Sequence, residues 1–184
     1  MDLSGTERRA GRPVLMAPPF VIYPHPALSR KALARPLDEP MIKAGAALLK
    51  AAEAVRAYGL AAAHLGLDEP IAVVSFATNP QERDYRLLFN PRIVELAEEV
   101  ETGTEGSVSL PGIEVPVQRP VRAVIGFQDA EGREQVERFE GFVARVAQHE
   151  IEQVEGIFFL RRVSITRRDA ALRRFRKNLL SATT

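Results

Sequence analysis

The stretch that decides the fold of this chain is Gln148-His149-Glu150-Ile151-Glu152-Gln153. Positions four residues apart lie on the same face of a helix. A His-Glu-x-x-His sequence therefore directs two imidazoles at one metal ion and places the glutamate beside it as a general base. Here the fifth position is Gln153, whose neutral amide is a poor ligand for zinc or ferrous iron. The stretch is either an altered metallohydrolase helix or an accidental match, and the rest of the chain decides between them.

The size and composition of the chain predict one ordinary domain. It has 184 residues, of which 46% are hydrophobic, and this is enough for a single core. The net charge is +1, so no global field favours nucleic acid or an anionic membrane. No apolar run approaches the roughly 20 residues that span a bilayer, and the polar N-terminus lacks the apolar core of a signal peptide. We therefore expect a cytoplasmic protein.

The supply of metal-binding side chains is small. The chain contains no cysteine, which excludes disulfides, cysteine-ligated zinc and cysteine nucleophiles. It contains three histidines, which are His25, His64 and His149. A site made from protein ligands must combine these with carboxylates, amides and hydroxyls.

The chain divides into three expected segments. Residues 1–19 contain three prolines and no periodic pattern, which is typical of a flexible arm. Residues 20–166 carry the strands and helices of the domain. Residues 167–184 are rich in arginine and are expected to form a basic C-terminal helix and tail.

Within the domain, Asp38-Glu39-Pro40 predicts the start of a helix that runs to about Tyr58, because a capping acid and an early proline favour a helix N-terminus. A second helix is expected from Gly141 to Val154, ended by Gly156. Turn and loop signals predict a small-residue turn at 59–63 and a loop at 102–116. The expected strands lie at 71–77, at 87–94 with a break at the proline, at 121–127, at 133–139 and at 157–160. Because the strands outnumber the helices and do not alternate with them, the fold class is α+β.

Three separated segments resemble one known family, the peptide deformylases. The first family motif, G-L-A-A-x-Q, is similar to Gly59-Leu60-Ala61-Ala62-Ala63-His64. The second, E-G-C-L-S, is similar to Glu105-Gly106-Ser107-Val108-Ser109, and the third, Q-H-E-x-D-H, is similar to the stretch at 148–153. The motifs occur in family order and spacing, and the resemblance covers roughly residues 20 to 165. It implies antiparallel strands around a central helix that bears His149.

The resemblance also implies a chemistry. Peptide deformylases remove the formyl group from the N-terminal methionine of new bacterial and organellar proteins, with Fe²⁺ or Zn²⁺ held by one cysteine and two histidines. By resemblance, the metal positions are Ser107, His149 and Gln153. The implied catalytic groups are Glu150, His64 and the backbone N–H of Val108, and the implied substrate-binding residues are Gly59, Leu60, Gly106 and Val108.

This sequence departs from the family at the chemical positions. Ser107 stands where the family has its ligand cysteine, Gln153 where it has its second histidine, and His64 where it has an oxygen-binding glutamine. The metal positions thus keep one imidazole and two weak neutral donors. We expect no tightly bound metal, and a cluster in which the side chains of Ser107, His149 and Gln153 hydrogen-bond to one another.

Two residues keep alternatives open. His64 has three possible roles. It is either a hydrogen-bonded histidine that lines the pocket implied by the resemblance or a donor to a substrate oxygen. The third role is that of a relocated metal ligand, together with His149 and a carboxylate. Glu150 is a general base beside a metal-bound water, or a buried carboxylate that pairs with a protonated His64 or His149. Ser107 is interpreted as a small polar filler rather than as a nucleophile activated by His149.

Two functions of different class follow. In the first, standard deformylase activity is lost or strongly reduced and the groove still binds formylated or other peptide N-termini. In the second, the chain is an active amidohydrolase with a rebuilt Fe²⁺ or Zn²⁺ site of His64, His149 and Glu150. Glu105 and Arg119 are expected to form an ion pair that braces the second motif. The basic C-terminal helix is expected either to be a solvated face or to contact the ribosome.

Overall fold

The computed structural model of the chain describes residues 20–182. The expected N-terminal arm, residues 1–19, lies outside the described residues. Within 20–182, no helix is long and apolar enough to cross a membrane. The helices are α1 (Glu39–Val55), α2 (Gly141–Val154) and α3 (Ile165–Ala182), with short 3₁₀ helices η1 (Pro26–Ser29), η2 (Ala62–Leu65) and η3 (Phe159–Arg162). The strands are β1 (Gly59–Ala61), β2 (Ile71–Ser75), β3 (Tyr85–Leu96), β4 (Val100–Gly106), β5 (Glu114–Pro120), β6 (Arg122–Gln128) and β7 (Glu134–Glu140).

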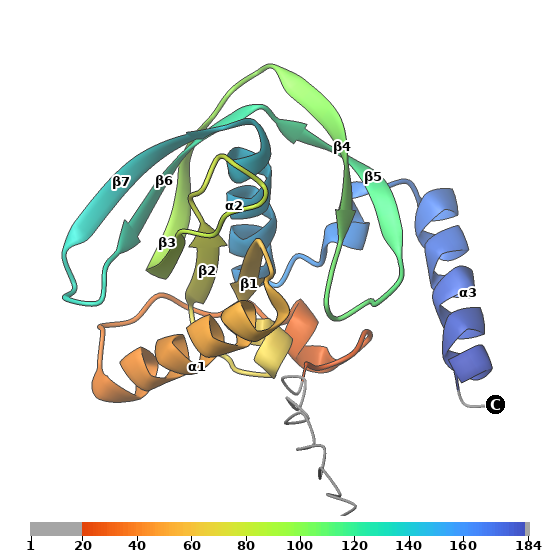
Figure 1. Ribbon diagram of the computed structural model, residues 1–184, viewed down its shortest axis with the longest axis horizontal. Helices are drawn as coiled ribbons and strands as arrows, with labels where there is room; N and C mark the ends of the chain where they lie inside the picture. The colour runs from red at the N-terminus through yellow and green to blue at the C-terminus, as the bar shows by residue number, and fades with distance from the viewer. Residues whose placement is uncertain (1–19, 183–184) are drawn as a thin grey trace, which may run out of the picture.

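The strands form two antiparallel sheets. One has five strands in the order β1-β2-β3-β6-β7, and the other consists of β4 and β5. Helix α2 runs between the two sheets, α1 lies under the larger sheet, and α3 stands at the outer side of β5 (Figure 1). This arrangement confirms the predicted α+β class and the central helix that bears His149.

Helix α2 occupies the centre because its apolar residues recur every three or four positions. Val143, Ala144, Ala147 and Ile151 are buried and pack against the larger sheet. The residues on the opposite side of the helix, which include His149, are thereby turned toward the smaller sheet. The packing of the helix thus sets the direction of the chemical side chains.

Strand β2 is apolar from Ile71 to Val74 because both of its faces are covered. Ile71 and Val73 pack in the cluster formed with α1, whereas Ala72 and Val74 contact clusters that include residues of α2. Side chains of a strand alternate between the two faces, so coverage on both sides requires a continuous apolar run. Helix α1 begins as predicted, with the Asp38 carboxylate accepting a hydrogen bond from the backbone N–H of Met41 at 2.9 Å.

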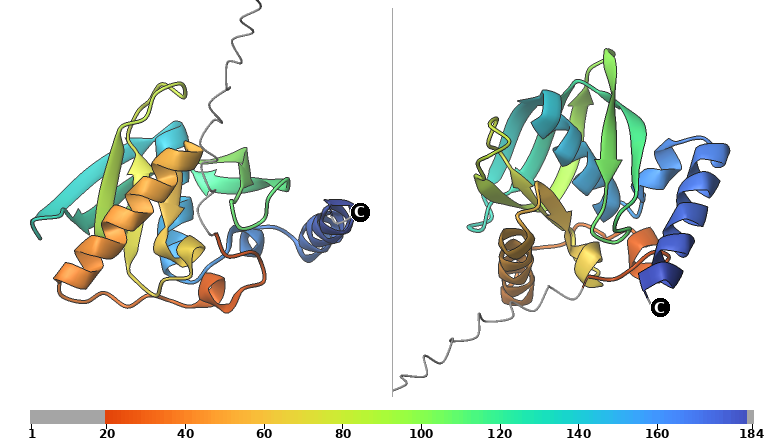
Figure 2. Two further views of the ribbon diagram at one scale, coloured as in Figure 1. Left: turned by 60° about the horizontal axis from the view of Figure 1, so that its bottom comes forward. Right: turned by 45° about the vertical axis from the view of Figure 1, so that its right-hand side comes forward.

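Helix α3 packs on the outer side of the smaller sheet (Figure 2). Ala171 and Phe175 of α3 are buried in a cluster with Val115 and Val117 of β5 and with Phe158. The C-terminal helix therefore shares a hydrophobic core with the rest of the domain.

Four segments differ from the sequence-based expectation. The expected loop at 102–116 contains most of β4 and the start of β5, and the expected turn at 59–63 forms β1 and the start of η2. Residues 157–160 form no strand, and only the last two of them belong to η3. The expected break at 87–94 is absent, because β3 is a single strand.

Three of these differences have a local physical basis. In β3 the pairing with β6 shifts register between Phe89 and Arg92, and this irregularity accommodates Pro91, which has no N–H to donate. In β5 the residues alternate between buried and exposed positions, although the neighbouring glycines and prolines suggested a loop. In β1 the small residues let the strand lie close to α2.

Candidate functional site

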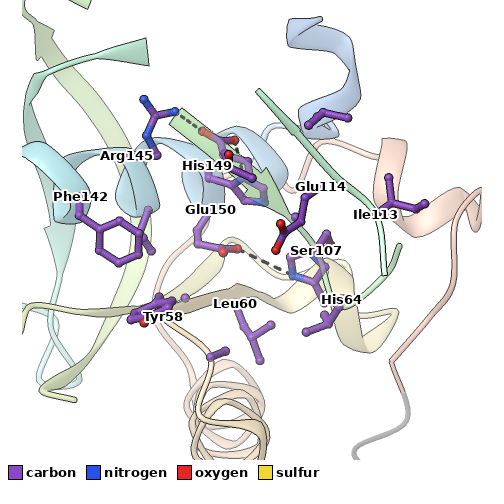
Figure 3. Close-up of a pocket in the computed structure, with 18 of the residues that line it drawn as sticks. Tyr58, Leu60, His64, Ser107, Ile113, Glu114, Phe142, Arg145, His149 and Glu150 are labelled. Carbon is purple, nitrogen blue, oxygen red and sulfur yellow. Dashed lines mark hydrogen bonds and ion pairs between the residues drawn. The ribbon is translucent and has the colours of Figure 1, made fainter. Parts of the chain in front are cut away.

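A pocket of about 690 Å³ lies between α2, β1 and the smaller sheet (Figure 3). Helix α2 contributes one wall, because Phe142, Arg145, Val146, His149 and Glu150 share the face opposite its apolar residues. Of the site residues inferred from the sequence, Gln153 alone does not line the pocket. The lining includes all the others, which are Gly59, Leu60, His64, Gly106, Ser107, Val108, His149 and Glu150.

His64 is buried, and both of its ring nitrogens are engaged. Nδ1 accepts a hydrogen bond from the backbone N–H of Ala61 at 3.0 Å, so the ring proton resides on Nε2. Nε2 lies 3.3 Å from Oγ of Ser107 and therefore donates to it. Burial and the nearby His149 lower the pKa of His64 to about 3, which agrees with a neutral ring. These contacts agree with the interpretation of His64 as a hydrogen-bonded histidine that lines the pocket.

The hydroxyl oxygen of Ser107 accepts two hydrogen bonds. One comes from Nε2 of His64, and the other comes from the backbone N–H of Ser109 at 3.1 Å. Both lone pairs of the oxygen are thereby used. Neither His64 nor His149 can accept the hydroxyl proton here, because His64 is the donor and His149 makes no hydrogen bond to Ser107. This arrangement does not activate Ser107 as a nucleophile.

His149 is oriented by a buried carboxylate. Nδ1 of His149 lies 2.9 Å from Oε2 of Glu105. Arg119 contacts the same carboxylate at two points, with Nε donating to Oε1 at 2.6 Å and Nη2 donating to Oε2 at 2.9 Å. Burial opposes the charge of His149, but the hydrogen bond to Glu105 and the nearby carboxylates outweigh it and raise the pKa of His149. Burial likewise raises the pKa of Glu105, but His149 and Arg119 outweigh it and lower that pKa to about 2. The expected ion pair between Glu105 and Arg119 is confirmed.

The expectation that Ser107, His149 and Gln153 form a hydrogen-bonded cluster is wrong. Its amide nitrogen donates to the backbone carbonyl of Leu28 at 2.9 Å, and its side chain is buried outside the pocket lining. The three side chains therefore make no hydrogen bond to one another within residues 20–182. The Gln153 amide donates to a buried backbone carbonyl, and the Ser107 oxygen already accepts from two donors, so the polar groups of both side chains are used elsewhere.

The expected pairing of Glu150 with a protonated histidine is not present either. Its Oε2 is buried and has no hydrogen-bond partner among the described residues, and the nearest histidine nitrogen, Nδ1 of His64, lies 3.8 Å away. That nitrogen is occupied by the Ala61 N–H, so the expected charged pair with His64 does not form. Within the described chain, no hydrogen bond links Glu150 to His149 either. Burial raises the pKa of Glu150 to about 7, and the charge of Glu105 acts in the same direction.

The two predicted glycines have steric roles at the pocket. A Cβ on Gly59 would lie 2.7 Å from Cγ of Glu150 and 2.8 Å from Cγ1 of Val146. A Cβ on Gly106 would lie 3.1 Å from the carbonyl oxygen of Ile113. At Gly59, only a glycine lets β1 approach α2 this closely.

The backbone N–H of Val108 has no hydrogen-bond partner within the described chain, and Val108 lines the pocket.

The predicted Glu105–Arg119 pair belongs to a larger ionic network whose other members were not predicted from the sequence. Arg119 also donates to Glu152 at 2.8 Å, and Arg162 pairs with the same carboxylate. Arg145 donates to Glu105 at 2.8 Å and to the backbone carbonyls of Glu101 and Val117. The participation of Arg145 could have been predicted from the sequence, because Arg145 lies one helical turn before His149 on the same face of the helix.

The comparisons with known proteins identify the family. The sequence matches a family model described as "Polypeptide deformylase" over residues 17–169. It is 36% identical over 161 residues to a protein of Rhizobium meliloti (strain 1021) named "Peptide deformylase-like", and the match covers 86% of this chain and 91% of that protein. A protein of the same strain named "Peptide deformylase" is 29% identical over 160 residues, covering 86% of this chain and 92% of that protein.

Solved structures agree with the sequence comparison. The crystal structure of peptide deformylase from Ehrlichia chaffeensis superposes with a TM-score of 0.82 at 26% identity, covering 90% of this chain and 98% of that one. The crystal structure of peptide deformylase from Thermus thermophilus gives a TM-score of 0.74 at 35% identity, covering 89% and 95%. The chain therefore belongs to the polypeptide deformylase family, as its sequence motifs predicted.

The divalent metal of this family does not fit the residues present here. The two lone pairs of Ser107 are occupied, and Gln153 is bonded to Leu28 outside the pocket. Of the three family ligand positions, His149 alone offers a good donor. Within residues 20–182, no three His, Asp or Glu side chains converge so that they could hold a metal ion. His64 adds no ligand, because both of its nitrogens are engaged.

Proposed function

We propose that this member of the deformylase family binds peptide ends in its pocket without a tightly bound metal, and that its deformylase activity is lost or strongly reduced. The observation that carries the proposal is the state of the family ligand positions. Ser107 and Gln153 hold hydrogen bonds that a metal ion would have to break, and neither offers the charge of a thiolate or the basicity of an imidazole.

The retained pocket supports the binding half of the proposal. Its volume of about 690 Å³ lies in the range of ligand pockets in proteins. Apolar side chains line it from several sides, and they include Tyr58, Leu60, Val108, Ile113, Phe142 and Val146. These surfaces suit a peptide whose side chains are apolar.

The comparison within one organism supports the same proposal. Rhizobium meliloti (strain 1021) has one protein named "Peptide deformylase-like" and another named "Peptide deformylase", and this chain shares 36% and 29% identity with them respectively. A family member without the standard activity can persist when a second copy supplies it.

The alternative is an amidohydrolase with a metal site rebuilt from His64, His149 and Glu150. That site would require His64 to release either the Ala61 N–H or Ser107. No contact in the described chain favours this rearrangement.

The test is a turnover assay with formyl-Met-Ala-Ser on the purified chain, with Fe²⁺, Zn²⁺, Co²⁺ or Ni²⁺ added in turn. We expect turnover at the level of the metal-containing buffer and less than one equivalent of bound metal by elemental analysis. A metal-dependent turnover that disappears in Glu150→Gln would establish the amidohydrolase instead. An active deformylase assayed in parallel verifies that the substrate and the metals are competent.

A further inference from the structure

Arg145 extends from α2 to the smaller sheet at the wall of the pocket. Its Nη1 donates to Oε1 of Glu105 at 2.8 Å and to the backbone carbonyl of Val117 at 2.9 Å, and its Nη2 donates to the carbonyl of Glu101 at 2.8 Å. The side chain is 11% exposed and lines the pocket, on the same side of α2 as His149 (Figure 3). These contacts hold the guanidinium group in one position at the wall.

Gly103 on β4 provides the space for this group. Side chains of a strand alternate between its two faces, so position 103 shares with Glu105 the face turned toward α2. A Cβ on Gly103 would lie 2.8 Å from both Cζ and Nε of Arg145 and 3.0 Å from Nη2. A side chain at position 103 would therefore displace the guanidinium group, so the glycine on β4 is matched to the arginine on α2.

The guanidinium group keeps donors for a ligand. Arginine has five N–H donors, two on each Nη and one on Nε. Within the described chain, Nε makes no hydrogen bond and Nη2 uses one of its two donors. Nε is also accessible, because the fully buried side-chain atoms without a partner among residues 20–182 belong to Ser109 and Glu150. Two adjacent nitrogens of Arg145 can therefore each donate to a ligand.

The charge of Arg145 is only partly balanced. Its acidic partner, Glu105, is shared with Arg119 and with Nδ1 of His149. Its other acceptors are backbone carbonyls, which carry no net charge. A ligand that brings a negative charge to this wall therefore meets an incompletely neutralised cation.

We propose that Arg145 makes this wall a carboxylate subsite, so that the pocket selects a peptide whose first side chain is acidic over one whose first side chain is long and apolar. This inference rests on the proposed peptide-binding function and names its ligand class. A peptide end that lies beside Glu150 places its first side chain one helical turn away, along the wall that contains Arg145.

The preference follows from the donors of the guanidinium group. A carboxylate has two acceptor oxygens for the two adjacent donors, and a planar guanidinium binds this shape well. An amide supplies one acceptor oxygen without the charge. A methionine side chain has no strong acceptor, and it would cover the donors of Arg145 while removing the water that satisfies them.

The test measures, by calorimetry on the full chain without added metal, the affinities of formyl-Glu-Ala-Ser, formyl-Gln-Ala-Ser and formyl-Met-Ala-Ser. We expect the glutamate peptide to bind about tenfold more tightly than the glutamine peptide, because hydrogen bonds between charged groups are the stronger ones. The methionine peptide should bind no more tightly than the glutamine peptide. The advantage of the glutamate peptide should shrink between about 50 mM and about 500 mM salt.

Two variants test the residue itself. Arg145→Met should abolish the preference for the glutamate peptide. Gly103→Ala keeps the charge but displaces the guanidinium group, and should reduce the same preference. This second variant leaves the side chain of Arg145 in place, so it gives a readout even if Arg145→Met fails to fold. Arg138→Met is the matched control, because it makes the same exchange at an exposed arginine on β7, and it should leave all three affinities unchanged.

The outcomes separate this inference from the function on which it rests. A methionine peptide that binds the unmodified chain as tightly as the glutamate peptide would overturn the inference while peptide binding stands. A glutamate preference that survives in folded Arg145→Met would overturn it as well, and Arg145 would then serve only to brace the smaller sheet. If none of the three peptides binds the unmodified chain, the proposed function fails and the inference fails with it.

Discussion

Gln153 stands at a ligand position of the family, and its side chain is held by a distant part of the chain. The amide reaches the carbonyl of Leu28, which is 125 positions away in the sequence. The sequence marks Gln153 as a substituted ligand, because its place in the motif is local information. The partner it contacts depends on tertiary placement of the N-terminal segment, which no motif contains. The positions of the site residues were therefore predictable, whereas their hydrogen-bond partners were not, with the exception of the Glu105–Arg119 pair.

Glu150 gives a prediction about stability and pH. Burial raises its pKa to about 7 from an ordinary value of 4.5, so the folded chain binds a proton that the unfolded chain has lost between those pH values. The free energy of unfolding contributed by Glu150 therefore falls as the pH rises from 4.5 to 7. Replacement by the neutral amide in Glu150→Gln should remove this loss. We expect the variant to exceed the parent by on the order of 2 to 3 kcal/mol at about pH 8 and to match it near pH 4.

The measurement is urea unfolding of both proteins at pH values from about 4 to 8, analysed as the difference between them. The difference is needed because His64 acts in the opposite sense, its pKa being lowered to about 3, so that protonation of the unfolded chain reduces stability below pH 6.5. Glu137→Gln makes the same change of residue type at an exposed carboxylate on β7 and is the control. A difference that is the same at both ends of the pH range would contradict the burial of a charge at Glu150.

At the scale of elements, the three helices were predicted from the sequence, and the smaller sheet was not, because its composition is typical of a loop. Helix α1 was predicted from the capping acid and the early proline at its start, α2 from the stretch at 148–153 and the glycine that ends it, and α3 from its arginine-rich sequence. The smaller sheet was missed because Gly103, Gly106 and the prolines of β5 are residues that usually mark loops. The structure explains Gly103, because a Cβ at this position would lie 2.8 Å from the guanidinium carbon of Arg145. That reason lies on α2, far from β4 in the sequence.

Helix α3 carries a basic face that gives a prediction about partners. Arg173, Arg176 and Lys177 are exposed, whereas Phe175 holds the helix on the core. We expect this basic face to bind ribosomal RNA, and binding through phosphate contacts should weaken steeply with salt. Purified ribosomes should retain the chain at about 50 mM salt and bind it at least roughly tenfold more weakly at about 200 mM.

The triple reversal Arg173→Glu, Arg176→Glu and Lys177→Glu should abolish this binding and leave the fold unchanged, because none of the three side chains is buried. Arg138→Glu is the matched control, since it reverses an exposed arginine on β7, at the other end of the molecule from α3 (Figure 1). Ribosome binding that is indifferent to salt, or that survives the triple reversal, would show the basic face to be only a solvated surface.

At the scale of the whole molecule, a buried ionic network holds the side chains around the family's ligand positions. Glu105 still holds Nδ1 of His149, as carboxylates commonly do behind a metal-bound histidine. Arg119 and Arg145 fix Glu105 in turn, and they connect the smaller sheet to α2. Breaking a buried ion pair of this kind usually costs about 3 to 5 kcal/mol. The network is therefore part of the fold itself, independently of any metal.

This separation of support and ligands predicts that metal binding can be restored. In the triple variant Ser107→Cys, Gln153→His and His64→Gln, the family ligand set returns to a scaffold in which His149 is already oriented. We expect one equivalent of bound Zn²⁺ or Co²⁺ by elemental analysis, and a melting temperature that rises with metal because only the folded chain binds it. At a metal concentration about 100 times the Kd the gain is about 2.7 kcal/mol, or roughly 5 to 10 °C for a chain of this size. A control with Ser109→Cys and Gln118→His introduces the same residue types outside the ligand positions and should show no rise. A folded triple variant that binds no metal would mean that the scaffold, and with it the placement of His149, has diverged along with the ligands.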